Sequence, residues 1–373
     1  MDTGTKTILI TGANGFIGKN LSVTLQERLN LKILTFCRND SIDKLCSLVE
    51  VADFIFHLAG ENRPDSPDMF DAVNRGLTED LSRILKNLNK ATPVMFTSSS
   101  QIALGNDYGT SKLAAENVLR SLSKSNGNPI VIFRLPGVFG KWCKPNYNSV
   151  VATFCHNVAH GLPIEVNDPN KILDLVYIDD VISSFVAQID DVVPGVKLEN
   201  EIPQYHLSVG DLANKIKAFE LSRSSLILEQ VGVGLMRALY STYVSYLPTD
   251  KFSYTVESHG DERGVFVEML KTSHSGQFSY FTAHPGITRG GHFHHTKTEK
   301  FLVIKGKAHF KFKNIISKES YELISSGARP QVVETVPGWS HDITNIGDDE
   351  MIVMLWANEI YNHDFPDTIT HEV

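Results

Sequence analysis

The sequence predicts two domains in series: an α/β domain built on a doubly wound parallel sheet at residues 1–247, and an all-β domain at residues 248–373. In the first part, short runs rich in Val, Ile and Phe alternate with helix-like stretches, as in a parallel sheet covered on both faces. After residue 247 the helical periodicity stops. Short aromatic and β-branched runs separated by turn residues take over, which is typical of a sandwich or barrel. A chain of 373 residues also exceeds what one hydrophobic core usually holds.

The composition is that of an ordinary soluble globular protein, with 42% hydrophobic and 21% charged residues. The formal net charge of −8, without any block of like charges, argues against a nucleic-acid partner and favours a small-molecule substrate. No apolar run approaches the roughly 20 residues that span a bilayer, so no membrane partner is expected. The four cysteines form no Cys-x-x-Cys pair and indicate free thiols in a reducing compartment. We therefore expect a cytoplasmic protein.

A glycine-rich turn at residues 11–18 follows the first predicted strand, Lys6–Ile10, and precedes a helix that begins near Lys19. Glycine lets the backbone turn sharply there, and the free N–H groups at the helix start attract a diphosphate. This position between a strand and a helix favours a dinucleotide site over an ordinary tight turn. The residues expected to contact the cofactor here are Gly12, Asn14, Gly15, Phe16, Ile17 and Gly18.

The alternation of strand-like and helix-like runs predicts the other elements of the first domain. Strands are predicted at residues 31–36, 54–60, 93–100 and 129–135, and helices at 78–88 and 111–122. In such sheets ligands bind beyond the carboxyl ends of the strands, which is where the glycine-rich turn lies.

The residues after the second strand bear on the choice of cofactor. Domains that prefer NAD usually place an acidic residue about 20 residues past the turn, where it holds the ribose 2′-hydroxyl. Here Arg38 occupies a position from which a guanidinium can pair with a 2′-phosphate, so NADPH is expected. The alternative is that Arg38 is a solvated loop charge and that Asp40 holds the ribose.

Tyr108 and Lys112 are four residues apart, which places them on one face of a predicted helix. A lysine ammonium beside a phenol lowers the pKa of the phenol and makes the tyrosine a usable proton donor to a ketone oxygen. A serine at the end of the preceding strand, Ser99 or Ser100, is in position to hydrogen-bond the same carbonyl. The alternative is that the spacing of Tyr108 and Lys112 arises by chance.

Taken together, the motifs of the first domain resemble those of the extended short-chain dehydrogenase/reductase family. They are T-G-x-x-G-x-x-G at 11–18, H-L-A-G at 57–60, Y-x-x-x-K at 108–112, R-L-P-G-V-F-G at 134–140 and V-Y-I-D-D at 176–180. The resemblance implies a Rossmann-like fold and a nicotinamide cofactor, with Leu58 and Ala59 among the cofactor-binding residues.

The same resemblance implies roles for three side chains: Tyr108 as the catalytic acid, Lys112 on the cofactor ribose and Ser99 on the substrate carbonyl. Ser99 is preferred over its neighbour, although its interval to Tyr108 is shorter than the family usually shows. Family members bind a nucleotide-sugar with the following part of the domain. Lys141 and Asn148 are therefore candidates for diphosphate contact, and an ordinary polar loop is the alternative.

The second domain contains a group of metal-ligating residue types among its predicted strands, which are residues 264–269, 277–283, 300–304, 307–312, 332–336 and 351–356. His292 and His294 alternate along a strand and so face the same side of the sheet. Glu299 and His341 can join them from neighbouring strands. Three imidazoles and a carboxylate suit a divalent ion such as Zn, Fe, Mn, Ni or Cu.

Two segments resemble the motifs of the cupin superfamily. They are G-x5-H-x-H-x4-E-x6-G at 286–306 and P-G-x-x-H-x3-N at 337–345, the second lacking one residue after its proline. The resemblance implies a jelly-roll that holds a divalent metal, with Zn expected. The implied ligands are His292, His294, Glu299 and His341.

Residues 261–268 and 288–292 resemble the nucleotide-hexulose 3,5-epimerase branch of the cupins, in which the histidine matching His292 is the catalytic base. A metal ligand keeps its lone pair on the ion and cannot also be the free base. We assign His292 to the metal, which leaves the epimerisation base unassigned.

A reductase joined to an epimerase-like cupin resembles the bifunctional bacterial enzymes of the UDP-N-acetyl-L-fucosamine route to capsule or O-antigen. The resemblance implies that the cupin domain epimerises C3 of a UDP-4-keto-2-acetamido-2,6-dideoxyhexose. The reductase domain then reduces C4 with NADPH, giving UDP-2-acetamido-2,6-dideoxy-L-talose. A homodimer is expected. Two alternatives remain: a metal dioxygenase fused to a reductase, and a non-catalytic sensor of NADPH and a sugar nucleotide.

Overall fold

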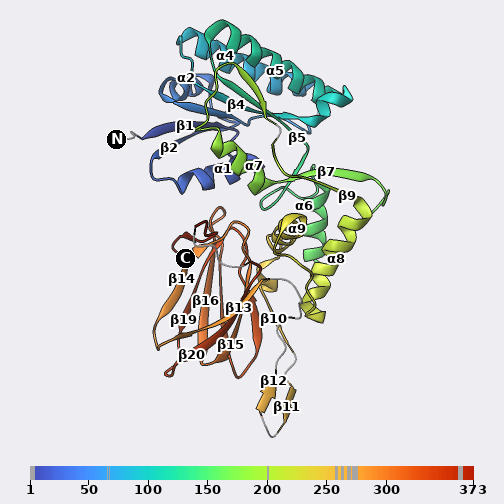
Figure 1. Cartoon of the computed structure of the whole chain (residues 1–373), viewed down its shortest axis with the longest axis vertical. Helices are drawn as coiled ribbons and strands as arrows, with labels where there is room; N and C mark the ends of the chain where they lie inside the picture. Colours follow the sequence, from blue (N-terminus) through green and yellow to red (C-terminus); the bar gives the residue numbers. More distant parts are fainter. Residues whose placement is uncertain are drawn as a thin grey trace. The chain divides into compact units, whose positions relative to one another are not determined.

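The computed structural model describes residues 5–64, 66, 68–199, 201–256, 259–261, 264–266, 270, 276–359 and 364–373. The chain divides into two compact units, Met1–Ser149 with Leu173–His206, and Val150–Ile172 with Leu207–Val373 (Figure 1). The second unit therefore includes helices α6 (Val150–Ala159), α8 (Val209–Ser225) and α9 (Gly234–Val244) as well as the all-β part. The domain boundary that the sequence predicts between residues 247 and 248 stays a prediction.

The first unit is organised around a six-stranded sheet in the order β2-β1-β3-β4-β5-β8, in which every neighbouring pair is parallel. The strand order reverses between β1 and β3, and ligands of such sheets bind at this reversal. The strands are β1 (Lys6–Thr11), β2 (Leu31–Phe36), β3 (Phe54–His57), β4 (Val94–Ser99), β5 (Ile130–Leu135) and β8 (Val196–Glu199). The doubly wound parallel sheet predicted from the sequence is thus confirmed.

Helices cover both faces of this sheet (Figure 1). They are α1 (Phe16–Gln26), α2 (Ile42–Val51), α3 (Asp68–Phe70), the π-helix η1 (Asp71–Gly76), α4 (Leu77–Asn87), the 3-10 helix η2 (Ser100–Leu104), α5 (Asp107–Asn126) and α7 (Ile178–Ala187). A small sheet, β6-β7-β9, adds β6 (Gly137–Phe139), β7 (Ile172–Tyr177) and β9 (Gln204–Ser208). Among the described residues no helix is both long and apolar enough to cross a membrane.

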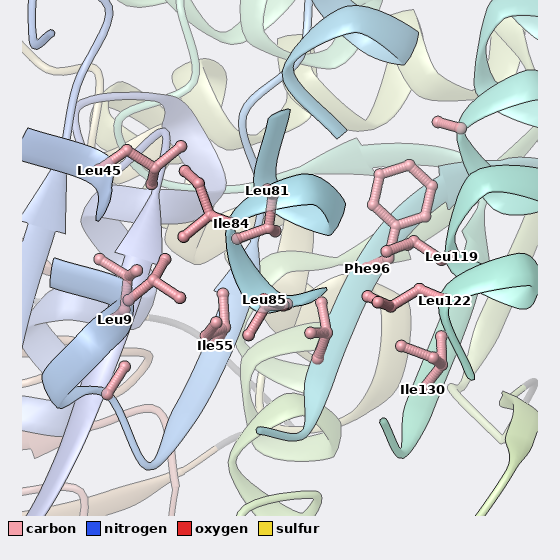
Figure 2. Close-up of a cluster of buried hydrophobic side chains, with 14 of the residues drawn as sticks. Leu9, Leu45, Ile55, Leu81, Ile84, Leu85, Phe96, Leu119, Leu122 and Ile130 are labelled. Carbon is pink, nitrogen blue, oxygen red and sulfur yellow. The ribbon is translucent and has the colours of Figure 1, made fainter. Parts of the chain in front are cut away.

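One face of the parallel sheet packs against α2, α4 and α5 through a continuous apolar cluster (Figure 2). Leu9, Ile55 and Phe96 come from neighbouring strands and are fully buried. Leu85 of α4 and Leu119 of α5 pack onto them. Since burial of one such side chain stabilises the fold by about 1.5–3 kcal/mol, this cluster holds the strand ends that carry the site in fixed positions.

The second unit contains two five-stranded antiparallel sheets, β10-β18-β15-β20-β13 and β17-β16-β19-β14-β21 (Figure 1). Ring centroids of Phe301 from the first sheet and Phe310 from the second lie 5.8 Å apart, so the two sheets pack face to face. This confirms the predicted all-β fold. The strands are β10 (Ser253–Thr255), β13 (Gln277–Ala283), β14 (Thr288–Phe293), β15 (Glu299–Lys305), β16 (Lys307–Asn314), β17 (Ser320–Ser326), β18 (Gln331–Glu334), β19 (Trp339–Asn345), β20 (Met351–Ala357) and β21 (Ile369–Thr370).

A separate two-stranded ladder joins β11 (His259–Asp261) to β12 (Gly264–Phe266). The strand predicted at 264–269 therefore begins as expected, while residues 267–269 lie outside the described residues. The same holds for Glu262, Arg263 and the last two positions of the epimerase-like stretch 261–268.

Helices α8 and α9 are fixed to the all-β part by buried polar contacts. Glu334 of β18 forms ion pairs with Lys300 of β15 and with Arg223 of α8, and all three side chains are nearly inaccessible to solvent. Ser241 of α9 donates a hydrogen bond of 2.7 Å to the carbonyl oxygen of Thr296. These contacts explain why the helices form one compact unit with the sheets. The short 3-10 helix η3 (Thr249–Lys251) precedes β10.

Candidate functional sites

The turn after β1 can be made only by glycine at two positions. Gly12 has φ +70°, and a Cβ atom there would lie 2.8 Å from the Cα of Ala59. A Cβ atom on Gly18 would lie 2.3 Å from the carbonyl oxygen of Gly12. Among the described side chains none caps the start of α1 at Gly15, so no side chain occupies the first N–H groups of the helix. This is the geometry of an anion site at a helix N-terminus.

The other predicted members of the turn surround this helix start. Asn14 is exposed, and Phe16 and Ile17 are half-buried. Leu58 and Ala59 follow β3 and lie against the turn, because the Leu58 N–H donates to the carbonyl oxygen of Thr11 at 3.3 Å. The sequence-predicted cofactor residues at 12–18 and 58–59 are therefore brought together at one edge of the sheet.

His57, the first residue of the H-L-A-G motif, is a structural residue. Its Nδ1 lies 2.8 Å from the hydroxyl of Thr11, and its Nε2 lies 2.9 Å from the hydroxyl of Thr78. Burial, assisted by the charge of Lys112, lowers the pKa of His57 to about 3. The neutral ring links the first strand to α4 beneath the turn.

Arg38 and Asp40 have different surroundings. The Arg38 side chain is 78% exposed, and its Nη2 lies 2.6 Å from Oε2 of Glu61. The Asp40 carboxylate accepts a 2.7 Å hydrogen bond from the backbone N–H of Cys37 and another of 2.7 Å from Lys44. Hydrogen bonding to Lys44 and Cys37 lowers the pKa of Asp40. Asp40 is thus held by its own loop and by α2, whereas the guanidinium of Arg38 remains accessible.

Glu61 is a site residue that the sequence did not single out. Its carboxylate is mostly buried and accepts hydrogen bonds from Arg38 at 2.6 Å, from the Arg63 N–H at 3.1 Å and from the Tyr147 hydroxyl at 3.2 Å. Burial favours a higher pKa for Glu61, but the hydrogen bonds from Arg63 and Arg38 outweigh it and lower the pKa. The one sequence feature that could have indicated Glu61 is its position directly after the H-L-A-G motif at the end of a strand.

Asn74, in the π-helix η1, is a second residue that was missed. Its side chain accepts a hydrogen bond from the Glu61 N–H at 2.9 Å and donates to the hydroxyl of Ser111 at 2.9 Å. A Cβ atom on Gly60 would lie 2.9 Å from the same amide oxygen. Asn74 therefore joins the loop after β3 to α5, and π-turns of this kind are frequent at functional sites.

Ser99, rather than Ser100, is the serine that reaches Tyr108. Ser99 is buried at the end of β4, close enough to the Tyr108 phenol to favour a lower pKa of that group. Ser100 is exposed and begins η2. Tyr108 lies in the first turn of α5, which the side chain of Asn106 caps by accepting a 2.7 Å hydrogen bond from the Gly109 N–H.

Lys112 lies on α5, one turn after Tyr108, and is 4% exposed. Its Nζ lies 4.5 Å above the ring of Phe96, and burial lowers the pKa of Lys112 to about 7. Burial also raises the pKa of Tyr108, against the opposing hydrogen bond from Ser99. The predicted lowering of the Tyr108 pKa by Lys112 is therefore wrong for the protein as described, because burial outweighs the opposing effect of Ser99 at Tyr108 and that of the Glu116 charge at Lys112.

Lys141 is not available for a ligand. It is 1% exposed, and its Nζ lies 2.6 Å from a carboxylate oxygen of Asp179, in the V-Y-I-D-D motif. Its carbonyl oxygen accepts a 3.3 Å hydrogen bond from Asn20 of α1. The proposed diphosphate contact by Lys141 is wrong, since the residue pins its loop to α1 and α7. Asn148 is exposed.

In the second unit, the four predicted metal ligands are brought together. Their ligand atoms all lie within 4.8 Å of one another. His292 of β14 and His341 of β19 are register partners, next to a β-bulge at residues 290–292. Gly290 permits the close approach, because a Cβ atom there, at φ +105°, would lie 2.7 Å from the His341 carbonyl oxygen. His294 follows β14, and Glu299 begins β15.

The donor set of this cluster fits a divalent cation. The carbonyl oxygen of Asp367 can only accept, so Nδ1 of His294 carries the proton and its Nε2 presents a lone pair. That Nε2 lies 3.1 Å from Oε2 of Glu299, and two acceptors at this distance require a cation or a proton between them. Both ring nitrogens of buried His341 lack a hydrogen-bond partner among the described residues.

Protonation states in the cluster agree with a cation site. Burial favours a higher pKa for Glu299, but the charge and hydrogen bond of His294 keep it well below its usual value. Burial, with the neighbouring imidazoles, lowers the pKa of His292 to about 4. Three imidazoles and an ionised carboxylate form a ligand set suited to Zn and to other divalent ions.

Comparisons with known proteins agree with both folds. Residues 8–200 match the NAD dependent epimerase/dehydratase family, and residues 259–369 match the polysaccharide biosynthesis C-terminal domain. The chain is 54% identical over 362 residues, covering 97% of each protein, to UDP-2-acetamido-2,6-beta-L-arabino-hexul-4-ose reductase of Pseudomonas aeruginosa.

Solved structures give the same picture. Capsular polysaccharide assembling protein CapF from Staphylococcus aureus matches with a TM-score of 0.67 and 39% identity, covering 98% of this chain and all of that one. WbmF of Bordetella bronchiseptica, in complex with NAD+ and UDP, shares the fold with a TM-score of 0.53 and 22% identity, covering 59% of this chain and 78% of that one. The chain belongs to the NAD dependent epimerase/dehydratase family and carries the polysaccharide biosynthesis C-terminal domain in addition.

Proposed function

We propose that the chain is a bifunctional UDP-sugar enzyme. Its second unit epimerises C3 of a UDP-4-keto-2-acetamido-2,6-dideoxyhexose, and its first unit then reduces C4 with NADPH to give UDP-2-acetamido-2,6-dideoxy-L-talose. The observation that carries the reduction is the arrangement of Ser99 at the end of β4 with Tyr108 and Lys112 one turn apart on α5. The relative that is 54% identical is named a reductase of a UDP-linked 4-ketohexose, and CapF is titled a capsular polysaccharide assembling protein.

The first unit supplies the acid for carbonyl reduction. NADPH, when bound, provides the hydride for C4. Burial raises the pKa of Tyr108, so its phenol is protonated at neutral pH and can deliver a proton to the oxygen that develops negative charge. Ser99 orients that oxygen with a second hydrogen bond. The tyrosinate left behind favours the ammonium form of Lys112. Because the pKa of Lys112 is about 7, its amine can take up a proton at neutral pH.

The second unit offers a site for proton removal at C3. His292, His294, Glu299 and His341 would hold a divalent ion, with Zn expected, and such an ion stabilises negative charge on a neighbouring oxygen. His292 is the half-exposed member of the set, whereas the other three are buried. Epimerisation has to precede reduction, because the C3 proton is acidic only while C4 is a ketone.

The proposal is tested by incubating the protein with a UDP-4-keto-2-acetamido-2,6-dideoxyhexose and NADPH in deuterated water. We expect NADPH oxidation together with deuterium at C3 of the product, detected by mass spectrometry and NMR. Reduction without deuterium at C3 would contradict the epimerase assignment. Oxygen uptake by the iron-loaded protein would support a dioxygenase instead, and tight binding without turnover would support a sensor.

If reduction and epimerisation take place at separate sites, a substitution in one site should leave the other activity intact. Tyr108→Phe should abolish NADPH oxidation and leave deuterium exchange at C3 intact. Tyr321→Phe, in the second unit, is a matched control that should keep both activities. Loss of both activities in a folded Tyr108→Phe protein would show that the two steps are not independent. We further propose a homodimer, which light scattering of the purified protein tests directly.

A further inference from the structure

The C-terminal segment 364–373 lies along the strands that carry the histidine cluster. β21 pairs with β14, placing Thr370 opposite His292. The backbone N–H of His371 donates to the carbonyl oxygen of Gly291 at 2.9 Å. The carbonyl oxygen of Glu372 accepts a 3.0 Å hydrogen bond from the hydroxyl of Ser340, the neighbour of His341. The segment thus contacts both strands of this sheet that carry a histidine of the cluster, β14 and β19.

Asp367 makes the most specific contacts of this segment. One carboxylate oxygen accepts a 2.8 Å hydrogen bond from the His295 N–H. The other accepts from the Thr296 N–H at 2.7 Å, from the Thr296 hydroxyl at 3.0 Å and from the Lys297 N–H at 2.6 Å. Its carbonyl oxygen accepts the Nδ1 proton of His294. Five donors from four consecutive residues therefore converge on one residue about 70 positions later in the chain.

The segment 294–297, which Asp367 binds, connects two residues of the cluster. It begins with His294, and Glu299 follows two positions after its end. Its other side is held by α9, through the hydrogen bond from Ser241 to the carbonyl oxygen of Thr296. Three backbone N–H groups that point at one spot form an anion nest, and only an ionised carboxylate can accept from all of them. An asparagine would turn its NH2 group toward one of these donors.

We infer that Asp367 is a positioning residue of the metal centre. It fixes the backbone of 295–297 and, through its carbonyl oxygen, the tautomer and ring orientation of His294, so that Nε2 faces Glu299 and His341. Groups that orient a ligand in this way typically change metal affinity by about 10–100-fold when they are removed. The inference rests on the metal site of the proposed function.

The experiment compares full-length wild type with Asp367→Asn and with Asp348→Asn, an exposed aspartate of the same unit, as the matched control. Each protein is stripped with a chelator. Zn affinity is measured by competition with a chromophoric chelator, and the visible absorption bands are recorded after Co²⁺ loading. We expect Asp367→Asn to weaken Zn binding by about 10-fold or more and to shift the Co²⁺ bands, because the ligand geometry changes. Asp348→Asn should match wild type in both.

Two results distinguish a failure of the positioning role of Asp367 from a failure of the proposed metal site. If wild type binds neither ion, both the metal site and the positioning role fail. If wild type binds Zn and a folded Asp367→Asn protein binds it with the same affinity and the same Co²⁺ spectrum, only the positioning role fails. Should Asp367→Asn not fold, Thr296→Val removes just one bond to the carboxylate. It should weaken Zn binding a few-fold, and unchanged binding would overturn the inference.

Discussion

Arg38 and Glu61 form an ion pair at the edge of the candidate cofactor site, with Nη2 of the guanidinium 2.6 Å from Oε2 of the carboxylate. Arg38 follows β2 and Glu61 follows β3, so the pair spans the carboxyl end of the first strand. The exposed fractions of the two side chains are 78% and 7%. One edge of the guanidinium is therefore engaged and oriented, while its remaining N–H groups stay accessible to a phosphate.

This relationship predicts the cofactor preference. Arg38→Ala should weaken NADPH binding by roughly 10-fold or more and leave NADH binding nearly unchanged, because a charge-assisted hydrogen bond contributes about 1.5–3 kcal/mol. Asp40→Asn is the matched test of the alternative, and we expect it to change neither affinity, since Cys37 and Lys44 already occupy its carboxylate. Calorimetric titration measures both. A selective loss of NADH affinity in Asp40→Asn would assign the ribose to Asp40 instead.

The glycine turn predicts a position-specific cost of a methyl group. Gly12→Ala would place a Cβ atom 2.8 Å from the backbone of Ala59, and we expect it to lose NADPH affinity by more than about 10-fold. Gly105→Ala is the control, because Gly105 also has positive φ, +63°, but no atom of the described residues lies within 4 Å of its Cβ position. It should cost about 1–2 kcal/mol of stability from strain alone and leave NADPH affinity unchanged. Normal NADPH binding by Gly12→Ala would contradict the assignment of this turn.

Local spacing explains which parts of the two sites could be predicted. The glycine turn, the Tyr108–Lys112 pair and the histidine pair at 292 and 294 each lie within a few residues of sequence, where local backbone geometry fixes which groups come together. Glu299 and His341 followed from motif spacing, and the structure brings them to the same point.

The residues that were missed act through partners distant in sequence. Asn74 reaches Ser111, and Asp367 reaches Thr296, so no periodicity within one element could indicate either contact. The predicted diphosphate contact of Lys141 was wrong for a related reason. A lysine in a polar stretch is usually exposed, but here Asp179 forms an ion pair with it inside the fold. The pKa of Tyr108 was misjudged because sequence spacing shows the neighbouring charge and not the burial.

The low pKa of Lys112 predicts a dependence of stability on pH. The folded pKa is about 7 and the ordinary value 10.5, so between these values the unfolded chain binds more protons than the folded one. The free energy of unfolding therefore rises with pH in this window and is constant with respect to this group below pH 7. Relative to Lys112→Met, wild type should gain about 2 kcal/mol between pH 7 and pH 8.5 in urea unfolding. Relative to the exposed Lys86→Met variant, which keeps Lys112, wild type should show no such gain. An equal slope in wild type and Lys112→Met would contradict the prediction.

Removal of the metal should affect the two activities differently. Because the histidine cluster belongs to the second unit, chelator treatment should abolish deuterium exchange at C3, leave NADPH affinity unchanged and be reversed by Zn. His341→Ala should behave like the stripped protein, whereas His309→Ala, which only breaks an exposed pair with Glu322, should behave like wild type. Exchange that persists in fully metal-free protein would restrict the ion to a structural role.

Glu334 is expected to be among the residues whose loss most destabilises the second unit. Its carboxylate lies between Lys300 and Arg223, and the side chains of Lys300 and Glu334 are 2% and 3% exposed. Glu334→Gln leaves the buried side chains of Arg223 and Lys300 without their carboxylate partner, so it should destabilise the protein by about 3–5 kcal/mol. Glu322→Gln, at an exposed ion pair, should stay within about 0.5 kcal/mol of wild type. Two of the three tryptophans, Trp339 and Trp356, lie in this unit, so their fluorescence reports its unfolding in urea. A loss below 1 kcal/mol in Glu334→Gln would show that water or a rearranged side chain reaches Arg223 and Lys300, and that the contacts of α8 with the sheets do not depend on this carboxylate.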